Sequence, residues 1–347
     1  MKTKERDVKY CNVREDYIKS NRPDLNDDRV KMLYDYIIQR YRIHLNRDYY
    51  KTEDYYDSVP SPIFREYKLT NIRREHDRTT KYLIENISHN ENISYVDKIY
   101  KSILFRLYNR LETADFIRLS DEDFFTDAIY SDKTISWVNK CRERFSHMRP
   151  EYRVYTNAYK TGGTNSGLKK LFPKEELMYM CPVLLVNQLI QEDFASQLTN
   201  CNSQLEVLNL LYDIKGIGYF IAYQLYVDLT YIEEFPFSEN EFTVAGPGCH
   251  YGIELLLKDR YDFKGFTPEE LVFWIRDNIG DEFNRLGLDW DPKKVFIDLP
   301  DYDQCLNVMS VENIMCEFQK WVRANSPEMS NPRNKYHKFV YSNPAKE

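Results

Sequence analysis

A short glycine-containing segment between two helical patterns constrains this chain more than any other feature. The segment reads Ile214-Lys215-Gly216-Ile217-Gly218. Apolar residues recur at helical spacing on both sides of it, which predicts helices at 203–213 and 218–231. Two glycines separated by one apolar residue permit a tight turn with Ile217 directed into the core. The N–H groups of such a turn begin the second helix, where partial positive charge attracts a phosphate.

Two interpretations of this segment are open. It is either an ordinary corner between two helices, or a helix-hairpin-helix that binds a DNA phosphate without regard to sequence. We favour the second interpretation, because both helices are in phase and Lys215 lies beside the turn. The predicted phosphate-binding residues are Lys215, Gly216, Ile217 and Gly218.

Helical periodicity extends over most of the remaining chain, so the predicted fold class is mostly α. Further helices are expected at 29–46, 71–87, 95–112, 132–146, 174–193, 248–258 and 308–324, and from the capped start Thr267-Pro268-Glu269-Glu270. One short strand is expected at 152–159. The predicted organisation is a charged N-terminal extension at 1–60, a helical domain at 61–325 and a loose tail at 326–347.

Charge and cysteine content exclude several classes of protein. The formal net charge of −7 argues against binding DNA over the whole surface and leaves room for a local basic groove. The seven cysteines include no Cys-x-x-Cys pair, so we expect neither a zinc knuckle nor a disulfide framework, and we predict no metal site. No apolar run reaches the ~20 residues of a membrane span, and no signal peptide is seen at the N-terminus. These features predict an intracellular protein without a membrane partner.

The hairpin segment and its flanking helices resemble the helix-hairpin-helix DNA glycosylases. Those enzymes carry a catalytic aspartate roughly twenty residues beyond the hairpin. Here that region reads Glu239-Asn240-Glu241-Phe242-Thr243-Val244-Ala245-Gly246-Pro247-Gly248, without an aspartate. The four-cysteine iron–sulfur loop of some members is also absent from the sequence. The resemblance therefore implies a glycosylase-like helical fold and argues against ordinary base excision.

Four other segments resemble a phage family, the α-glutamyl/putrescinyl-thymine pyrophosphorylases, which hypermodify thymine. A related helical domain occurs fused to hydroxymethyluracil-DNA kinases. The segments are Phe64 to Thr80, similar to T-N-x-x-R-x-x-D-R; Leu104 to Thr113, similar to R-x-x-N-x-x-E-T; Asp228-Leu229-Thr230 with Gly246-Pro247-Gly248; and Met315 to Trp321, similar to C-E-F-x-K-aromatic. Their order and spacing cover residues from about 60 to 325.

This resemblance implies a reaction on double-stranded DNA. The substrate would be a pyrophosphate ester of 5-hydroxymethyluracil, and an amine would replace pyrophosphate at the methylene carbon. The co-substrate would be an amino acid or a polyamine, and no other cofactor is implied with certainty. The protein would work in the cytoplasm of a host cell if a phage encodes it, or in the nucleus if a eukaryote does.

The chemistry of that reaction suggests which side chains take part. Arginine and lysine would hold the pyrophosphate, and a carboxylate would take the proton of the amine. The candidate catalytic residues are Asp228, Arg78, Arg74, Asp77, Arg106, Glu317 and Lys320. Arg74 and Arg78 are expected on one helix face, and burial is expected to raise the pKa of Asp228. The alternatives are a solvated helix face for the arginines, a structural ion pair for Glu317 and Lys320, and a local hydrogen bond between Asp228 and Thr230.

A flipped base also needs a pocket with amide partners and stacking faces. The candidate substrate-binding residues are Asn71, Asn109, Tyr155, Asn157, Tyr159, Thr230, Gly246, Pro247 and Gly248. The Gly-Pro-Gly segment would bind an anion or form a wall for the base, or it is simply a helix entry.

The segment Gly162 to Lys169 nearly matches a phosphate-binding loop. Leu168 separates the last glycine from Lys169, and no Ser or Thr follows the lysine, so a nucleotide site is not expected. A flexible loop that contacts DNA or pyrophosphate is the preferred interpretation.

Three functions are weighed on this basis. The leading one is the amine transferase; the others are a glycosylase-like base-excision enzyme and a non-catalytic reader of modified DNA.

Overall fold

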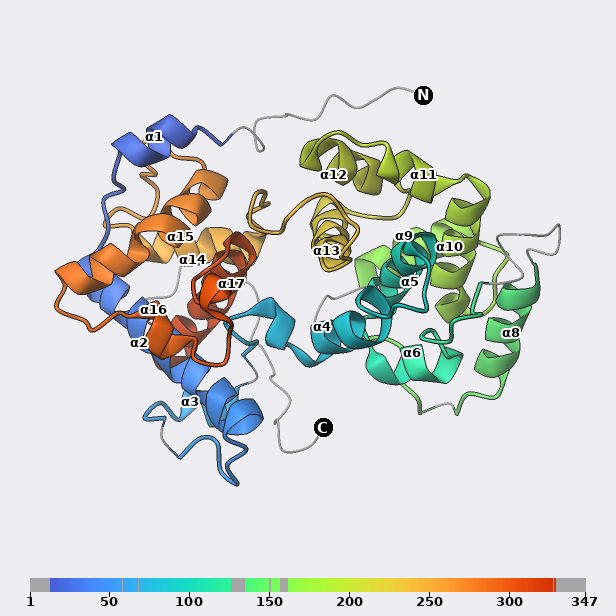
Figure 1. The fold of residues 1–347 in the computed structure, drawn as a ribbon, viewed down its shortest axis with the longest axis horizontal. Helices are drawn as coiled ribbons and strands as arrows, with labels where there is room; N and C mark the ends of the chain where they lie inside the picture. The colour runs from blue at the N-terminus through green and yellow to red at the C-terminus, as the bar shows by residue number, and fades with distance from the viewer. Residues whose placement is uncertain are drawn as a thin grey trace. The chain divides into compact units, whose positions relative to one another are not determined.

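The computed structural model confirms a mostly helical chain. It describes residues 13–57, 59–67, 69–125, 135–149, 151–156, 162–326 and Glu328, and these contain helices and no strand (Figure 1). Two compact units are formed, one by 1–77 with 239–347 and the other by 78–238. This division differs from the boundaries at 60 and 325 expected from the sequence. The N-terminal helices belong to the first unit together with the C-terminal ones.

The first unit is arranged around one long helix, α17 (Val308–Asn325), with which α2, α3, η3, α14 and α15 make contact. Its other helical elements are α1 (Glu15–Ser20), α2 (Asp27–His44), η2 (Leu45–Tyr49), α3 (Ile63–Glu66), η3 (Arg74–His76), α14 (Pro247–Leu256), α15 (Pro268–Arg285), α16 (Pro292–Val295) and η6 (Asp301–Asp303). The predicted start of α15 is confirmed, because the Thr267 hydroxyl accepts from the Glu270 N–H and the Glu270 carboxylate accepts from the Thr267 N–H.

The second unit is arranged around α5 (Tyr95–Tyr108), which is buried over most of its length and contacts α6, α10, α11 and α13. Its other helical elements are α4 (Arg78–Leu83), η4 (Ile84–Ser88), α6 (Leu111–Ile117), α8 (Ile135–Ser146), α9 (Gly162–Leu171), η5 (Met178–Met180), α10 (Cys181–Gln191), α11 (Phe194–Thr199), α12 (Gln204–Asp213) and α13 (Tyr219–Thr230). Ser94 caps the start of α5, and Asn109 ends it in a left-handed conformation with φ of 51°.

Several local predictions are wrong. The expected helix at 95–112 ends at Tyr108, and the one expected at 174–193 begins only at Cys181. The expected helix at 71–87 is interrupted at Asp77, whose backbone is extended with ψ of 139°, so η3 ends there and α4 begins afterwards. Arg74 and Arg78 therefore do not share a helix face. The described part of the expected strand, 152–156, is irregular. The segment Gly162 to Lys169 is helical rather than a loop.

Candidate functional site

The glycine hairpin has the local geometry expected from the sequence. Helix α12 ends at Asp213, the turn follows, and α13 begins after Gly218, which is its N-cap. Gly216 has φ of 87°, a conformation that favours glycine. Ile217 is buried and donates its N–H to the Ile214 carbonyl at 3.0 Å. Lys215 and Gly218 are exposed, so the start of α13 is accessible to a phosphate.

Gly167 of helix α9 packs closely against the hairpin. A Cβ on Gly167 would lie 3.3 Å from the Gly216 Cα, and a Cβ on Gly216 would lie 3.0 Å from a Leu168 methyl. The backbones of α9 and the hairpin thus approach closely, and Leu168 is fully buried. These contacts give Gly167 and Leu168 a packing role against the hairpin.

The second unit contains a buried ion pair that joins two candidate residues. Arg106 on α5 donates from Nε and Nη2 to the two carboxylate oxygens of Asp228 on α13, both at 2.5 Å. Neither side chain is more than 1% exposed. Arg106 also donates to Asn109 Oδ1 at 2.9 Å, and Asn109 Nδ2 donates to Thr156 Oγ1 at 3.0 Å. Both ends of the Asn109 amide are therefore engaged within the protein.

Other candidate residues of this unit lie apart from that pair. Arg78 is 74% exposed and donates to Glu112 at 2.8 Å. The Tyr155 ring packs on Tyr108 with centroids 5.6 Å apart. The Thr230 hydroxyl donates to the Val227 carbonyl at 2.7 Å. Asn157 and Tyr159 lie outside the described residues.

In the first unit, residues 69–77 form a strap held by hydrogen bonds. Asn71 donates its N–H to Asp77 Oδ1 at 3.0 Å and its side-chain amide to the His76 carbonyl at 2.8 Å. Arg40 of α2 donates to Asn71 Oδ1 at 2.8 Å and to the Thr70 carbonyl at 2.9 Å. Burial raises the pKa of Asp77 against the opposing effect of these N–H groups. The Asn71 amide, like that of Asn109, is used inside the protein.

Helix α17 presents polar side chains to this strap. Asn313 donates to the Asn71 carbonyl at 2.7 Å, and Glu317 accepts from the Thr70 N–H at 3.3 Å. Lys320 forms an ion pair with Glu317. The pairing expected as an alternative for these two residues is therefore present, and Lys320 remains 22% exposed at the edge of the cluster.

Glu312 is the strongest candidate that sequence reasoning missed. It lies on α17, 4% exposed, and accepts from the Gly246 N–H at 3.3 Å. Burial raises its pKa to about 7, with Arg74 lowering it and Glu317 raising it by their charges. A carboxyl group with a pKa near neutrality is suited to general acid–base work. The only feature of the sequence that could have indicated Glu312 is its position as an acid within the apolar run that begins α17.

The Gly-Pro-Gly segment begins helix α14, with Gly246 as N-cap and Pro247 in the first turn. Two carboxylates lie at this end, because the Ala245 N–H donates to Glu269 at 3.0 Å while Gly246 donates to Glu312. Burial also raises the pKa of Glu269. Carboxylates of the protein thus accept from the N–H groups of Ala245 and Gly246, at the segment where the sequence suggested binding of an external anion.

Helices α14 and α17 pack at very close range. A Cβ on Gly248 would collide with Cys316 Sγ, and one on Gly252 would collide with the Met315 carbonyl. Small residues are required at both positions. This contact places Gly246 beside Glu312.

We define the α17 cluster as Arg74, Glu269, Glu312, Glu317 and Lys320. The structure thus gathers Asn71, Arg74, Asp77, Glu317, Lys320 and Gly246 in the first unit, and Arg106, Asn109 and Asp228 in the second. The catalytic and binding roles assigned to them remain predictions.

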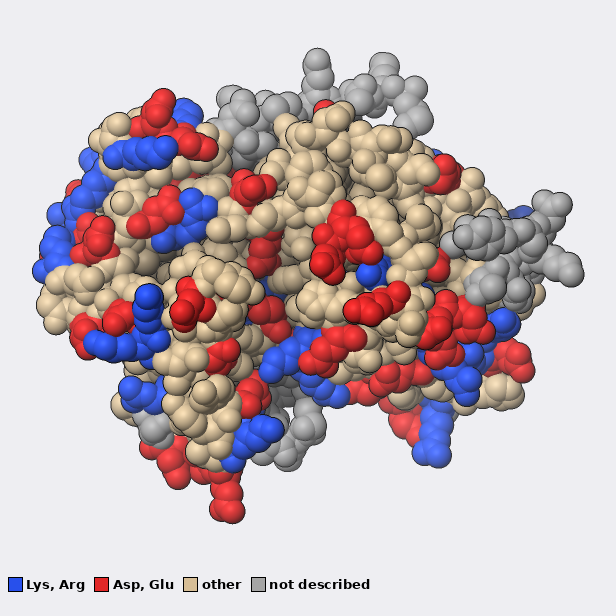
Figure 2. Space-filling view, viewed as in Figure 1, with Lys and Arg blue, Asp and Glu red and all other residues tan. Residues whose placement is uncertain are grey.

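On the face shown in Figure 2, lysine and arginine side chains are interspersed with aspartate and glutamate. Among the residues that the structure describes, no helix combines the length and apolar character that a membrane crossing requires.

Comparison with known proteins gives two matches. Residues 27–331 match the family described as "5-hmdU DNA kinase, helical domain". A protein of Bacillus phage SP10 named "5-hmdU DNA kinase" is 24% identical over 332 residues, which cover 91% of this chain and 48% of that protein. The chain thus spans about half the length of this curated relative. No solved structure matches.

Proposed function

Since the chain belongs to the family of 5-hmdU DNA kinase helical domains, we propose that it acts on a 5-hydroxymethyluracil derivative in phage DNA. We further propose that it is a transferase that releases pyrophosphate and joins an amine to the base. The family match over 27–331 is the observation that carries the choice of substrate. The α17 cluster supports the choice of reaction, because it combines cations with a carboxyl group of near-neutral pKa.

The reaction replaces one bond by another. The amine nitrogen forms a bond to the methylene carbon of 5-(pyrophosphoryloxymethyl)uracil, and the bond from that carbon to the ester oxygen breaks. Pyrophosphate leaves with the electron pair, and the proton lost by the amine passes to a carboxylate. A nucleotide-dependent kinase must supply the pyrophosphate ester before this step.

The residues of the first unit fit these needs. Arg74 and Lys320 are the cations we assign to the leaving group. Glu312 is the carboxylate we assign to the proton, because burial places its pKa at about 7. Lys320 marks the side of the cluster that reaches solvent.

The hairpin of the second unit is the assigned DNA contact. Its exposed Gly218 N-cap precedes a twelve-residue helix, and Lys215 adds one positive charge beside it. Such a contact binds the backbone and leaves base selection to other residues. We retain the glycosylase-like fold as part of this proposal.

Nucleoside mass spectrometry tests the proposal. The full chain is incubated with duplex DNA that carries 5-(pyrophosphoryloxymethyl)uracil, together with single amino acids or polyamines. The expected result is release of pyrophosphate and a nucleoside heavier by the amine. Glu312→Gln should lower the rate by about 10²–10⁴-fold, as expected when a general base is removed. Glu143→Gln, an exposed acid of the other unit, is the matched control.

Three outcomes would overturn the proposal. Abasic sites would identify a base-excision enzyme. Binding of modified DNA without turnover over the whole amine panel would identify a reader. ATP-dependent phosphorylation of 5-hydroxymethyluracil DNA, without amine transfer, would assign the kinase reaction to this chain.

A further inference from the structure

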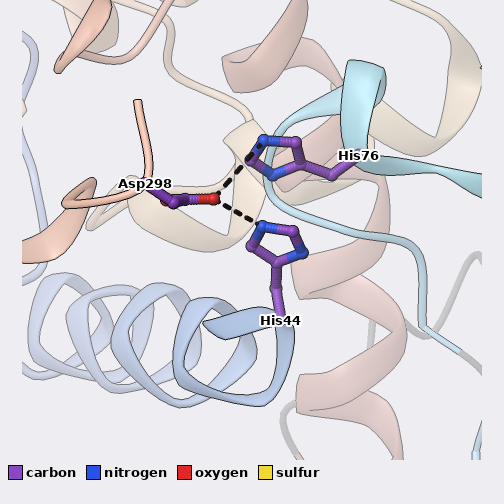
Figure 3. Close-up of side chains that lie close together, drawn as sticks. All are labelled: His44, His76 and Asp298. Carbon is purple, nitrogen blue, oxygen red and sulfur yellow. Dashed lines mark hydrogen bonds and ion pairs between the residues drawn. The ribbon is translucent and has the colours of Figure 1, made fainter. Parts of the chain in front are cut away.

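Two histidines and an aspartate from three distant segments converge in the first unit (Figure 3). His44 is the last residue of α2, His76 ends η3, and Asp298 lies in the loop between α16 and η6. One ligand atom from each lies within 4.8 Å of the other two. Both histidines are buried, and the Asp298 side chain is 10% exposed.

The two imidazole rings point at the same carboxylate oxygen. Asp298 Oδ2 lies 2.7 Å from His44 Nε2 and 3.8 Å from His76 Nε2. The rings are stacked, with centroids 3.9 Å apart and planes 12° apart, which brings the two Nε2 atoms to one side (Figure 3). Two ligands of one tetrahedral zinc ion are roughly 3.4 Å apart, given bonds of about 2.0–2.1 Å. Of the two observed separations from Asp298 Oδ2, the 2.7 Å to His44 Nε2 is shorter than that value and the 3.8 Å to His76 Nε2 is longer.

A second set of residues orients this group. Asp48 Oδ2 lies 3.0 Å from His44 Nδ1, the nitrogen that faces away from Asp298. Tyr41 donates its hydroxyl to the other oxygen of Asp298 at 2.5 Å. A carboxylate on the far nitrogen of a ligating histidine fixes its tautomer and strengthens it as a ligand. The arrangement around His44 has this form.

We propose that His44, His76 and Asp298 bind one divalent transition-metal ion, with zinc as the preferred ion. Two imidazoles and one carboxylate suit zinc and its first-row neighbours rather than calcium or magnesium. Three protein ligands leave a further position for water. This site was not predicted from the sequence, because its ligands are widely separated along the chain and no cysteine takes part.

The ion would join three segments of the first unit. His76 belongs to the strap 69–77, and its carbonyl accepts from Asn71. Arg74 and Asp77 flank it on the same strap. Metal binding would therefore fix the end of α2, the strap and the loop at Asp298 against one another, and it would restrain Arg74 of the α17 cluster. This inference does not depend on the proposed reaction.

The alternative is a protonated His44 held between Asp48 and Asp298. Arg47 pairs with Asp48, and Arg73 of the strap pairs with Glu75 and Asp303, so the charges of both arginines are compensated within the protein. A charged imidazole would satisfy both carboxylates without a metal. Zinc and a proton compete for the same nitrogen, so direct binding measurements separate the two cases.

Metal analysis of the full, untagged chain tests the site. After treatment with a chelator, the protein is titrated with Zn²⁺ alone and followed by calorimetry and by thermal unfolding. We expect one Zn²⁺ per chain and a rise in Tm on binding. Co²⁺ should give the visible absorption of a nitrogen- and oxygen-bound ion.

Substitutions locate the ion. His76→Ala and Asp298→Asn should each weaken Zn²⁺ binding at least tenfold, and Asp48→Asn should weaken it by about 10–100-fold. His89→Ala and His147→Ala, at exposed positions, should leave binding unchanged. Asp298→Asn preserves side-chain volume, and circular dichroism checks that each variant is folded. Absence of stoichiometric Zn²⁺ binding by the wild-type chain would overturn the proposal. So would binding by folded Asp298→Asn and His76→Ala that is as tight as that of wild type.

Discussion

The two units bury charge in different ways. In the second unit, Arg106 and Asp228 match each other with two hydrogen bonds, and both are nearly inaccessible. In the first unit, the α17 cluster brings three carboxylates together with Arg74 and Lys320, and burial raises the pKa of two of those carboxyls. A matched pair has the character of a structural element, whereas a cluster with surplus acid is poised to exchange a proton or bind a ligand. The difference separates residues that look equally catalytic in the sequence.

The most direct test of this difference is to remove one partner of the matched pair in the second unit. Asp228→Asn leaves the Arg106 charge buried without its carboxylate, and we expect a loss of about 3–5 kcal/mol in the free energy of unfolding. Urea denaturation measures it. Glu112→Gln removes the partner of exposed Arg78 and should cost less than about 1 kcal/mol.

A double variant completes this test. Replacing the pair by Arg106→Met with Asp228→Leu removes both charges and should recover much of the stability lost by Asp228→Asn. If Asp228→Asn were fully stable but inactive in amine transfer, Asp228 would belong to the reaction and the contrast between the units would fail.

The pH dependence of stability tests the α17 cluster of the first unit. Burial raises the pKa of Glu312 to about 7 in the folded state, above the ~4.3 of an unfolded chain. The stabilisation that depends on the neutral form of Glu312 is therefore fully present below the pKa of the unfolded chain. It is lost as the pH rises through the folded-state pKa of about 7. Glu312→Gln stays neutral, so its stability relative to wild type should rise by up to ~3 kcal/mol between pH 4 and pH 8.

Urea denaturation of both proteins across this pH range measures the difference. A difference between Glu312→Gln and wild type that is the same at every pH would show that Glu312 does not titrate in this window.

Local patterns predicted most helices because the core-facing residues repeat at helical spacing. The bounds of α12, α13 and α17, and the start of α15, fall within two residues of those expected. Helix α9 was missed because its Gly167 is explained by close approach to Gly216, a contact that sequence spacing does not encode. The break at Asp77 was missed for a similar reason, since it depends on hydrogen bonds from Asn71.

The candidate site was only partly predictable. Glu317 and Lys320 could be paired from their spacing on one helix. Glu312 could not be connected with Gly246, because close packing between α14 and α17 brings them together. The same holds for His44, His76 and Asp298, which three separate segments supply. Tertiary contacts, rather than local propensity, create these groups.

The hairpin offers a smaller effect that combines backbone geometry with close packing, because an added Cβ on Gly216 would also lie 3.0 Å from a Leu168 methyl. Gly216 has φ of 87°, so Gly216→Ala should cost about 1–2 kcal/mol in the free energy of unfolding. Gly218 has an ordinary extended backbone and nothing within 4 Å of an added Cβ, so Gly218→Ala should cost less than about 1 kcal/mol. Urea denaturation of the two variants makes the comparison. Equal losses would show that the turn does not require the left-handed conformation.

The smallest expected effect concerns the charge beside the hairpin. Lys215 is exposed and makes no predicted contribution to the core, so Lys215→Gln should leave unfolding unchanged. If its ammonium group contacts a DNA phosphate, the variant should bind duplexes of different sequence with a uniform loss of affinity. The slope of log K against log salt should then fall by about 1. Fluorescence anisotropy at several salt concentrations measures this slope, with Lys31→Gln of the first unit as a control at another exposed lysine. An unchanged slope for Lys215→Gln would place the DNA contact elsewhere. It would leave Gly216 explained by its left-handed backbone and close packing, and Gly218 by its position as N-cap of α13.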